Sequence, residues 1–174
     1  MSEHALRSAL WLGPACACCI AIAACAARSS PTHPAAGSAP VDLELTSAEG
    51  RRFFLSELGG GPLLLFVFTT YDDACQLGLA PLERVLRAHP KLHALGIAVQ
   101  PNAEQLLPLY REALAVSFPL AHDPAGLLLH GQSELGRVST VPTYFLLDDH
   151  RQITARHVGL LTQGDLETFV ASVH

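Results

Sequence analysis

One cysteine in the body of the chain, Cys75, stands beside side chains that could change its reactivity. It follows Asp72 and Asp73 and comes soon after the apolar run Leu63–Phe68, in the segment LLLFVFTTYDDACQLGLAP. A cysteine near the start of a helix is favoured as a thiolate by the free backbone N–H groups and the helix dipole. Nearby carboxylates have the opposite effect and raise the pKa of the thiol. The sequence therefore predicts a single thiol whose reactivity depends on which effect is larger.

Four further cysteines all lie within the first 25 residues, at Cys16, Cys18, Cys19 and Cys25. A disulfide inside the folded body and a multi-cysteine zinc site are therefore excluded. An improvised metal cluster would have to combine four side chains, Asp72, Asp73, Cys75 and His122. The nine histidines include no HxH or HExxH motif that would favour such a site. No metal ion or other cofactor is expected.

The composition indicates a globular α/β protein. The chain has 174 residues, of which 49% are hydrophobic and 16% are charged, enough for one domain and an extension. The formal charge is −5, and no cluster of lysine and arginine is present to displace counterions from phosphates. Nucleic acid is therefore excluded as a partner.

The N-terminus has the layout of a secretory signal. A short polar start with one positive charge, Arg7, precedes an almost wholly apolar run over residues 9–27. The segment Ile22-Ala23-Ala24-Cys25 resembles the bacterial lipobox, in which the cysteine is lipidated and becomes the mature N-terminus. We expect residues 1–24 to be a lipoprotein signal peptide and Cys25 to be the lipidation site. An uncleaved anchor helix is the alternative, because about 18 apolar residues just span a bilayer.

Residues 25–40 are expected to form a flexible tether. The stretch RSSPTHPAAGSAP, which ends at Pro40, is biased toward Pro, Ser, Ala and Gly. Acylation at Cys25 would attach the domain to a membrane without embedding it. By resemblance to known sorting rules, Ala26 after Cys25 favours the outer membrane of the bacterial envelope, with the domain facing the periplasm.

Strand and helix patterns alternate through residues 41–174. A β-hairpin is expected over residues 41–45 and 51–55, followed by a short helix at 56–58 and a buried strand at 63–68. The next elements are a helix over 74–88, a strand over 92–99 and a helix over 101–116 opened by Asn102 as N-cap. A strand at 118–121, a helix at 125–135, strands at 144–147 and 152–158 and a last helix at 163–173 follow. The order ββαβαβαββα implies a parallel core and is that of an elaborated thioredoxin fold.

The segment VSTVPTYFLLD, from Val138 to Asp148, resembles the cis-proline loop and following strand of TlpA-like thiol-disulfide oxidoreductases. These oxidoreductases of bacterial envelopes are members of the thioredoxin and redoxin superfamily. The resemblance covers Val41 to His174. It implies a thioredoxin-like α/β fold with an N-terminal β-hairpin and a central mixed sheet flanked by helices. It also implies a cis bond before Pro142. By the same resemblance, substrate would be bound by four residues: Tyr71, Val141, Pro142 and Thr143.

The chain departs from this family at the active site, where the family has Trp-Cys-x-x-Cys. If Cys75 matches the second cysteine, Asp72 takes the position of the nucleophile. If the flanking Phe68 and Pro81 are matched without a gap, Asp73 takes that position and Gln76 the resolving one. In both registers an aspartate stands where the attacking sulfur should be, so dithiol exchange is not expected.

Two functions remain open. In the first, an envelope redox protein retains monothiol chemistry through Cys75 and forms mixed disulfides with a partner. In the second, a catalytically inactive thioredoxin-fold module holds an extended protein segment at the Pro142 groove. Cys75 would then be a packed, unreactive side chain. Asp72 and Asp73 would be the N-cap and a first-turn acid of the helix.

Overall fold

The computed structural model describes residues 39–172. Its strands are β1 (Glu44–Ser47), β2 (Arg52–Phe54), β3 (Leu63–Phe68), β4 (His93–Ala98), β5 (Leu120–His122), β6 (Thr143–Leu147) and β7 (Ile153–Val158). Its helices are α1 (Asp73–Ala88), α2 (Ala103–Leu114), α3 (Leu127–His130) and α4 (Gln163–Ala171), with the short 3-10 helix η1 (Leu55–Glu57) after β2. The predicted element order is confirmed.

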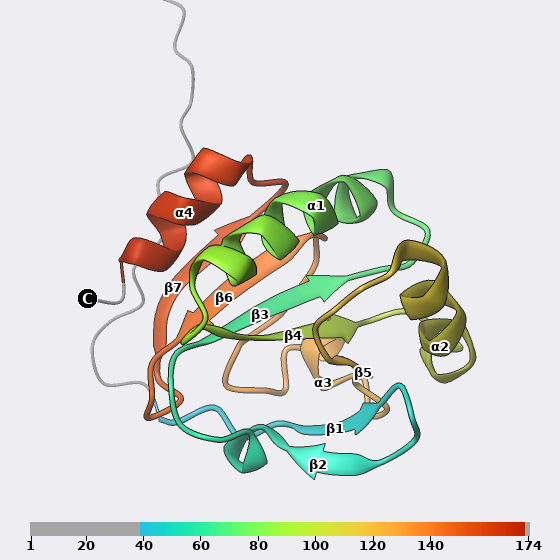
Figure 1. Ribbon diagram of the computed structural model, residues 1–174. Helices are drawn as coiled ribbons and strands as arrows, with labels where there is room; N and C mark the ends of the chain where they lie inside the picture. Colours follow the sequence, from blue (N-terminus) through green and yellow to red (C-terminus); the bar gives the residue numbers. More distant parts are fainter. Residues whose placement is uncertain (1–38, 173–174) are drawn as a thin grey trace, which may run out of the picture.

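All seven strands form one mixed sheet in the order β2-β1-β5-β4-β3-β6-β7 (Figure 1). Strands β3, β4 and β5 run parallel, while β6 pairs antiparallel with β3 and β7 with β6. The β1–β2 hairpin pairs with β5 and closes the other side. This is a thioredoxin-like α/β fold with its hairpin at the N-terminal side.

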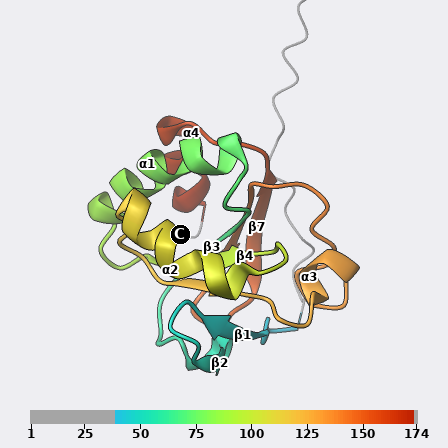
Figure 2. The ribbon, with the colours of Figure 1, turned by 90° about the vertical axis from the view of Figure 1, so that its right-hand side faces the viewer.

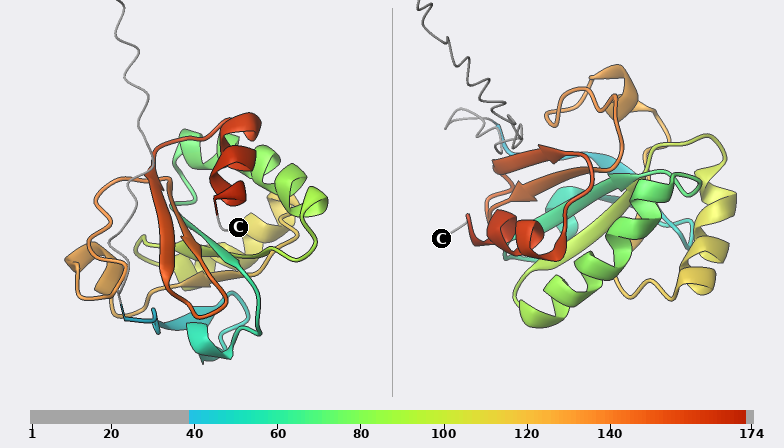
Figure 3. Two further views of the ribbon diagram at one scale, coloured as in Figure 1. Left: turned by 90° about the vertical axis from the view of Figure 1, so that its left-hand side faces the viewer. Right: turned by 90° about the horizontal axis from the view of Figure 1, so that it is seen from above.

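Strand β3 lies inside the sheet between β4 and β6, and all six of its side chains are apolar and fully buried. Alternate residues point to opposite faces of a strand, so each face receives three of these side chains. On one face, Leu64, Phe66 and Phe68 join the core formed with α1, α2 and α4. On the other face, Leu63, Leu65 and Val67 join a second core with α3 and the loops around it. Figures 2 and 3 show α1 and α4 on one side of the sheet and α3 on the other.

Two sequence predictions about helices are corrected. The helix expected over 125–135 is only four residues long, because Gly126 and Gly131 adopt positive φ angles of 68° and 70° at its two ends. Asn102 does occupy the N-cap of α2, but it is left-handed, with φ of 58°, and its side chain makes no capping hydrogen bond. The expected capping mechanism is therefore wrong, although the position is right.

The buried side chain of Arg151 fastens the glycine-rich loop between η1 and β3. Its guanidinium donates to four backbone carbonyl oxygens. These are the carbonyls of Gly61 and Gly59 at 2.8 Å each, of Asp148 at 3.2 Å, and of Leu58. The Arg151 carbonyl in turn accepts from the Val41 N–H at 2.9 Å. One residue thus joins the β6–β7 turn to the first segments of the domain.

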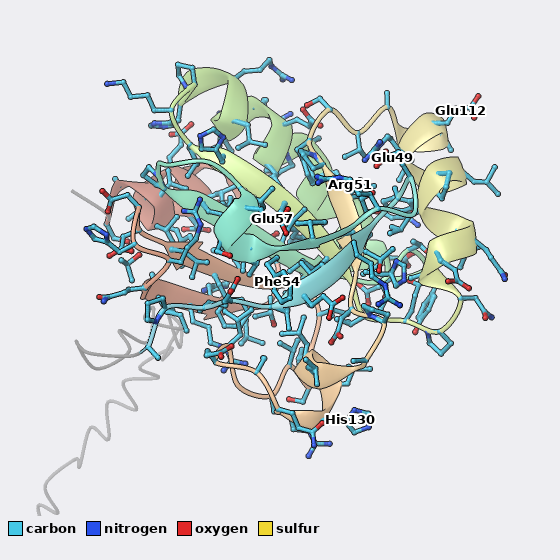
Figure 4. The ribbon with its side chains drawn as sticks, turned by 90° about the horizontal axis from the view of Figure 1, so that it is seen from below. Glu49, Arg51, Phe54, Glu57, Glu112 and His130 are labelled. Carbon is cyan, nitrogen blue, oxygen red and sulfur yellow. The ribbon has the colours of Figure 1, made fainter. Side chains whose placement is uncertain are left out.

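The edge beside this loop is polar and exposed. In Figure 4, Phe54 and Glu57 lie near each other along β2 and η1, with Arg51 close by. The Phe54 N–H donates to Glu57 Oε1 at 2.9 Å, and Arg51 approaches the same carboxylate at 3.9 Å. These contacts cover the free edge of the sheet with charged side chains, which disfavour pairing with another strand.

The expected signal peptide, most of the tether and the lipidation site Cys25 lie outside the described residues. Within residues 39–172, no helix has the length and apolar character needed to cross a membrane.

Candidate functional site

The start of α1 and the cis-proline loop meet at one end of the sheet. Strand β3 ends at Phe68, and after four connecting residues the chain enters α1 at Asp73 (Figure 1). Strand β6 runs back along β3 with Thr143 opposite Val67, so Pro142 lies beside the end of β3. The Val141–Pro142 peptide bond is cis, as the sequence predicts. The topology therefore brings together the two segments that the sequence singles out.

The loop between β3 and α1 is held through Thr70. The buried Gln100 side chain accepts from the Thr70 N–H, and its amide donates to Thr70 Oγ1 at 2.8 Å. Gln76 donates to the Thr70 carbonyl at 3.0 Å. Sequence reasoning missed Gln100, because a lone glutamine after a strand carries no motif. Its two bonds fix the path of the chain just before Asp72.

Asp72 is the N-cap of α1. Its backbone is extended, with φ of −89° and ψ of 124°, and its carboxylate accepts a 2.8 Å hydrogen bond from the Cys75 N–H. Asp73 is the acid of the first turn and is exposed to solvent. Both positions suit an acid, because the N-terminal amides and the helix dipole stabilise negative charge. The side chains that face each other across the first turn are thus Asp72 and Cys75.

Cys75 is a fully buried free thiol. It belongs to the core that includes Phe66, Phe68 and Tyr144. Burial is the main reason that its pKa rises to about 12, and the hydrogen bond and charge of the Asp72 carboxylate raise this pKa further. A backbone hydrogen bond at Thr69 lowers the pKa but does not offset these effects. The thiol therefore stays protonated at neutral pH.

The residues expected to bind substrate differ in accessibility. Tyr71 is 72% exposed, Val141 is half-buried, and Pro142 is buried with its carbonyl accepting from the Gly159 N–H at 2.8 Å. Thr143 is fully buried, and its hydroxyl donates to the Thr140 carbonyl at 2.6 Å. Tyr144 is also fully buried. The most accessible of these residues is therefore Tyr71, followed by the half-buried Val141.

The improvised metal cluster does not form in the described part of the chain. Within residues 39–172, no three His, Cys, Asp or Glu side chains gather closely enough to hold a metal ion. His122 lies at the end of β5, which is separated from β3 by β4. The described site thus consists of the Asp72–Cys75 pair, the exposed Tyr71 and the cis-proline loop.

Comparison by sequence finds distant relatives among thiol-disulfide oxidoreductases. No protein-family profile matches the chain. It is 25% identical to the thiol-disulfide oxidoreductase ResA of Halalkalibacterium halodurans over 136 residues, covering 78% of this chain and 75% of the relative. It is 24% identical to the thiol-disulfide oxidoreductase ResA of Geobacillus kaustophilus over 143 residues, which cover 82% of this chain and 80% of the relative.

Comparison by structure finds the same fold. StoA of Bacillus subtilis matches with a TM-score of 0.60 and 21% identity, over 76% of this chain and 98% of StoA. A secreted disulfide oxidoreductase of Mycobacterium tuberculosis matches with a TM-score of 0.62 and 20% identity, over 75% of this chain and 95% of the oxidoreductase. A DsbF homologue of Corynebacterium diphtheriae matches with a TM-score of 0.69 and 16% identity, over 84% of this chain and 95% of the homologue. The mixed sheet and the cis-proline loop give the chain the thioredoxin-like fold of these structures, and its sequence is similar to those of thiol-disulfide oxidoreductases named ResA.

Proposed function

We propose that this protein is a binding module of TlpA-like descent, tethered to the bacterial envelope, that holds an extended protein segment and does not catalyse thiol-disulfide exchange. The observation that carries the proposal is the state of Cys75, which is fully buried and faces the Asp72 carboxylate. Exchange begins when a thiolate attacks a disulfide sulfur, and a carboxylate cannot replace it. The nucleophile position is assigned to Asp72, because Asp72 faces Cys75 across the first turn.

The binding surface is assigned to the cis-proline loop and its apolar neighbours. The Val141 N–H and carbonyl make no hydrogen bond within the described residues, so both are free to pair with an extended backbone. Leu77 of α1 is 66% exposed, and Leu160, whose side chain lies near Gly78 of the same helix, is 44% exposed. Tyr71, just before α1 in sequence, is 72% exposed. A partner segment would add main-chain hydrogen bonds at Val141 and apolar contacts with these three side chains.

A monothiol oxidoreductase is the second candidate, and the names of the ResA relatives favour it. In that function Cys75 would form a mixed disulfide with an envelope protein. It would first have to leave the core, because its side chain has no exposed surface. The two functions therefore differ in one measurable property, the reactivity of Cys75 in the folded protein.

That property is tested by alkylation of the full chain, with the Cys75 peptide quantified by mass spectrometry across pH. We expect slow modification at neutral pH and rapid modification once urea unfolds the domain. Fast modification of the folded protein at pH 7 would overturn the binding-module proposal in favour of monothiol chemistry. Peptide-level detection separates Cys75 from the four N-terminal cysteines.

Segment binding is tested with a library of extended peptides on the same protein. Tyr71→Ala is expected to weaken the peptides that bind by fivefold or more, because it removes the most exposed apolar side chain beside the groove. Leu109→Ala is the matched control, since Leu109 is 65% exposed on α2. Equal losses in both variants would show that binding does not use the groove.

The tether is proposed to be a lipid on Cys25, with the domain facing the periplasm and the outer membrane as its attachment site. The lipobox-like segment supports this proposal, and one structural neighbour is described as a secreted oxidoreductase. Fatty-acid labelling in bacterial cells is expected to mark the wild-type chain and to be lost in Cys25→Ser. Labelling that persists in the variant would contradict this anchor.

A further inference from the structure

An open cavity of about 330 Å³ lies at the end of the sheet opposite the cis-proline loop. Strands β3 and β4 begin at this end, and α1 and α4 both finish there, on the left of Figure 1. Within residues 39–172, six apolar residues contribute to its wall: Pro62, Ala88, Pro90, Leu92, Val170 and Ala171. Neither Cys75 nor Pro142 contributes, so the cavity is separate from the proposed groove.

The polar part of the wall belongs to a basic stretch of the chain. His89 and Lys91 line the cavity beside the apolar residues. Residues 84–103 include three arginine or lysine residues and two histidines but no acid. Arg87 is exposed and lies 3.8 Å from Glu83, whereas the exposed Lys91 forms no ion pair within residues 39–172. The mouth of the cavity therefore favours an anionic group beside an apolar one.

The described chain enters the domain at this same end. The Val41 N–H donates to the carbonyl of Arg151 in the β6–β7 turn, and the Arg151 guanidinium holds the loop that leads to Pro62. A lipid at Cys25 would lie 16 positions before Val41, which is at most about 55 Å in a fully extended chain. The end that carries the cavity is therefore the end to which the proposed tether is joined.

We propose that this end of the domain faces the membrane and that the cavity takes an acyl chain of an anionic phospholipid. Burial of methylene groups against the apolar wall is favourable in proportion to the area removed from water. The C-termini of α1 and α4 disfavour an anion, because their carbonyls carry partial negative charge. The phosphate is therefore assigned to the Lys91 ammonium group, three positions beyond the end of α1. Access to the bilayer rests on the proposed tether, but the affinity of the cavity does not.

The test is an NMR titration of the full chain carrying Cys25→Ser, so that no lipid is attached, with dihexanoylphosphatidylglycerol below its micelle concentration. We expect saturable shifts of the Leu92 and Val170 signals. Dihexanoylphosphatidylcholine, whose headgroup has no net charge, should bind at least fivefold more weakly, and glycerol 3-phosphate, which lacks acyl chains, at least tenfold more weakly. Unshifted Leu92 and Val170 signals at about 10 mM lipid, where a millimolar site is mostly filled, would overturn the proposal. Equal binding of either comparison compound would overturn it too.

Variants of the same chain test the assigned wall. Lys91→Gln is expected to weaken binding of the phosphatidylglycerol probe fivefold or more, and Arg52→Gln, which removes an exposed charge on β2, is its matched control. Ala88→Asp places a carboxylate in the wall and is expected to weaken binding tenfold or more. Its control is Ala113→Asp, at an exposed position near the end of α2. Equal effects of a variant and its control would overturn the assignment.

The cavity and the tether fail separately in these experiments. If Leu92 and Val170 do not respond to the lipid, fatty-acid labelling at Cys25 is unaffected, and only the membrane-facing cavity is overturned. If Cys25 is not labelled in cells, the affinity measured with Cys25→Ser is unchanged, and only the tether is overturned.

Discussion

At the scale of single residues, Asp72 has two effects on α1. It caps the helix by accepting from the Cys75 N–H, and its charge makes ionisation of the same residue's thiol less favourable. In a thiol-disulfide oxidoreductase, the helix N-terminus instead stabilises a thiolate. The same backbone position thus either activates or suppresses sulfur chemistry, depending on which side chain occupies it.

The raised pKa of Cys75 predicts a specific loss of stability in alkali. The thiol titrates near 8.5 in an unfolded chain and at about 12 in the folded protein. The protonated thiol's contribution to the free energy of unfolding is therefore fully present below pH 8. It is lost as the pH rises from about 8.5 toward 12. At pH 10 the free energy of unfolding should have fallen by about 2 kcal/mol through this group.

Urea unfolding at pH 7 and pH 10 measures this effect, with Cys75→Ala as the comparison. The variant removes the thiol, so its stability should fall by about 2 kcal/mol less than that of the wild type over this range. Burial raises the pKa values of Tyr110 and Tyr144 in both proteins, and the charge of Cys75 raises them further in the wild type alone. Identical losses in the two proteins would contradict the raised pKa of Cys75.

Some residue roles could be predicted from the sequence and others could not. The N-cap and first-turn roles of Asp72 and Asp73 follow from local backbone chemistry, which depends on a few neighbouring positions. Gln100 binds Thr70, 30 positions earlier in the chain, and His122 pairs with Thr46 of β1. The contacts of these two residues exist only after folding, so no local sequence pattern predicts them.

At the scale of elements, the first turn of α1 retains the spacing of a Cys-x-x-Cys motif. Asp72→Cys should therefore form a disulfide with Cys75, at the cost of about 1 kcal/mol from the lost N-cap. The matched variant Asp73→Cys should not, because residue 73 is exposed and Cys75 is buried. Intact mass after mild oxidation, with the four N-terminal cysteines replaced by serine, reports the loss of two hydrogens. A disulfide in Asp73→Cys alone would favour the other register.

Gly78 shows how helix α1 fits against β6. A Cβ added to Gly78 would lie 2.8 Å from the hydroxyl of the fully buried Tyr144. Alanine is about 1 kcal/mol better than glycine in a helix interior, yet Gly78→Ala is expected to destabilise the fold by about 1–3 kcal/mol through overcrowding. Tyr144→Phe removes the hydroxyl, so Gly78→Ala should cost less in that background. Thermal unfolding of the double-mutant cycle measures this coupling, and equal costs in both backgrounds would contradict the contact.

The elements predicted best are those with strong patterns. The bounds of β3 are as predicted, since a continuous apolar run fits only a strand buried on both faces. Helix α3 is shorter than predicted because the backbone turns left-handed at Gly131, well before Leu135, where the predicted helix ends. Periodicity reports which residues are apolar, but the positive φ angle that ends this helix depends on tertiary contacts.

At the scale of the whole molecule, Arg151 is expected to be one of the most sensitive positions. It is 7% exposed, and the hydrogen bonds of its guanidinium go to backbone carbonyls. Arg151→Met should lower the free energy of unfolding by about 3 kcal/mol or more, because one buried and four partly buried hydrogen bonds to backbone carbonyls are lost.

Urea unfolding compares this variant with Arg87→Met. Arg87 is exposed and forms an ion pair with Glu83 at 3.8 Å, so the control is expected to change stability by at most about 0.5 kcal/mol. Arg151→Lys should fall between them, since an ammonium group has fewer donors than a guanidinium. Comparable stability of Arg151→Met and the control would show that the loop is held by other contacts.

The position of Arg151 also bears on how the chain folds as it is synthesised. The carbonyls that it binds at Gly61 and Gly59 precede it by 90 and 92 positions. The glycine loop therefore leaves the ribosome long before its donor exists, and its carbonyls stay solvated until the β6–β7 turn has emerged. The Val41 N–H also gains its acceptor, the Arg151 carbonyl, only at that moment, although β1 pairs with β5, which emerges earlier. A nascent chain stalled before Arg151 should accordingly be cut by proteases in the glycine loop, and one stalled well beyond it should be protected.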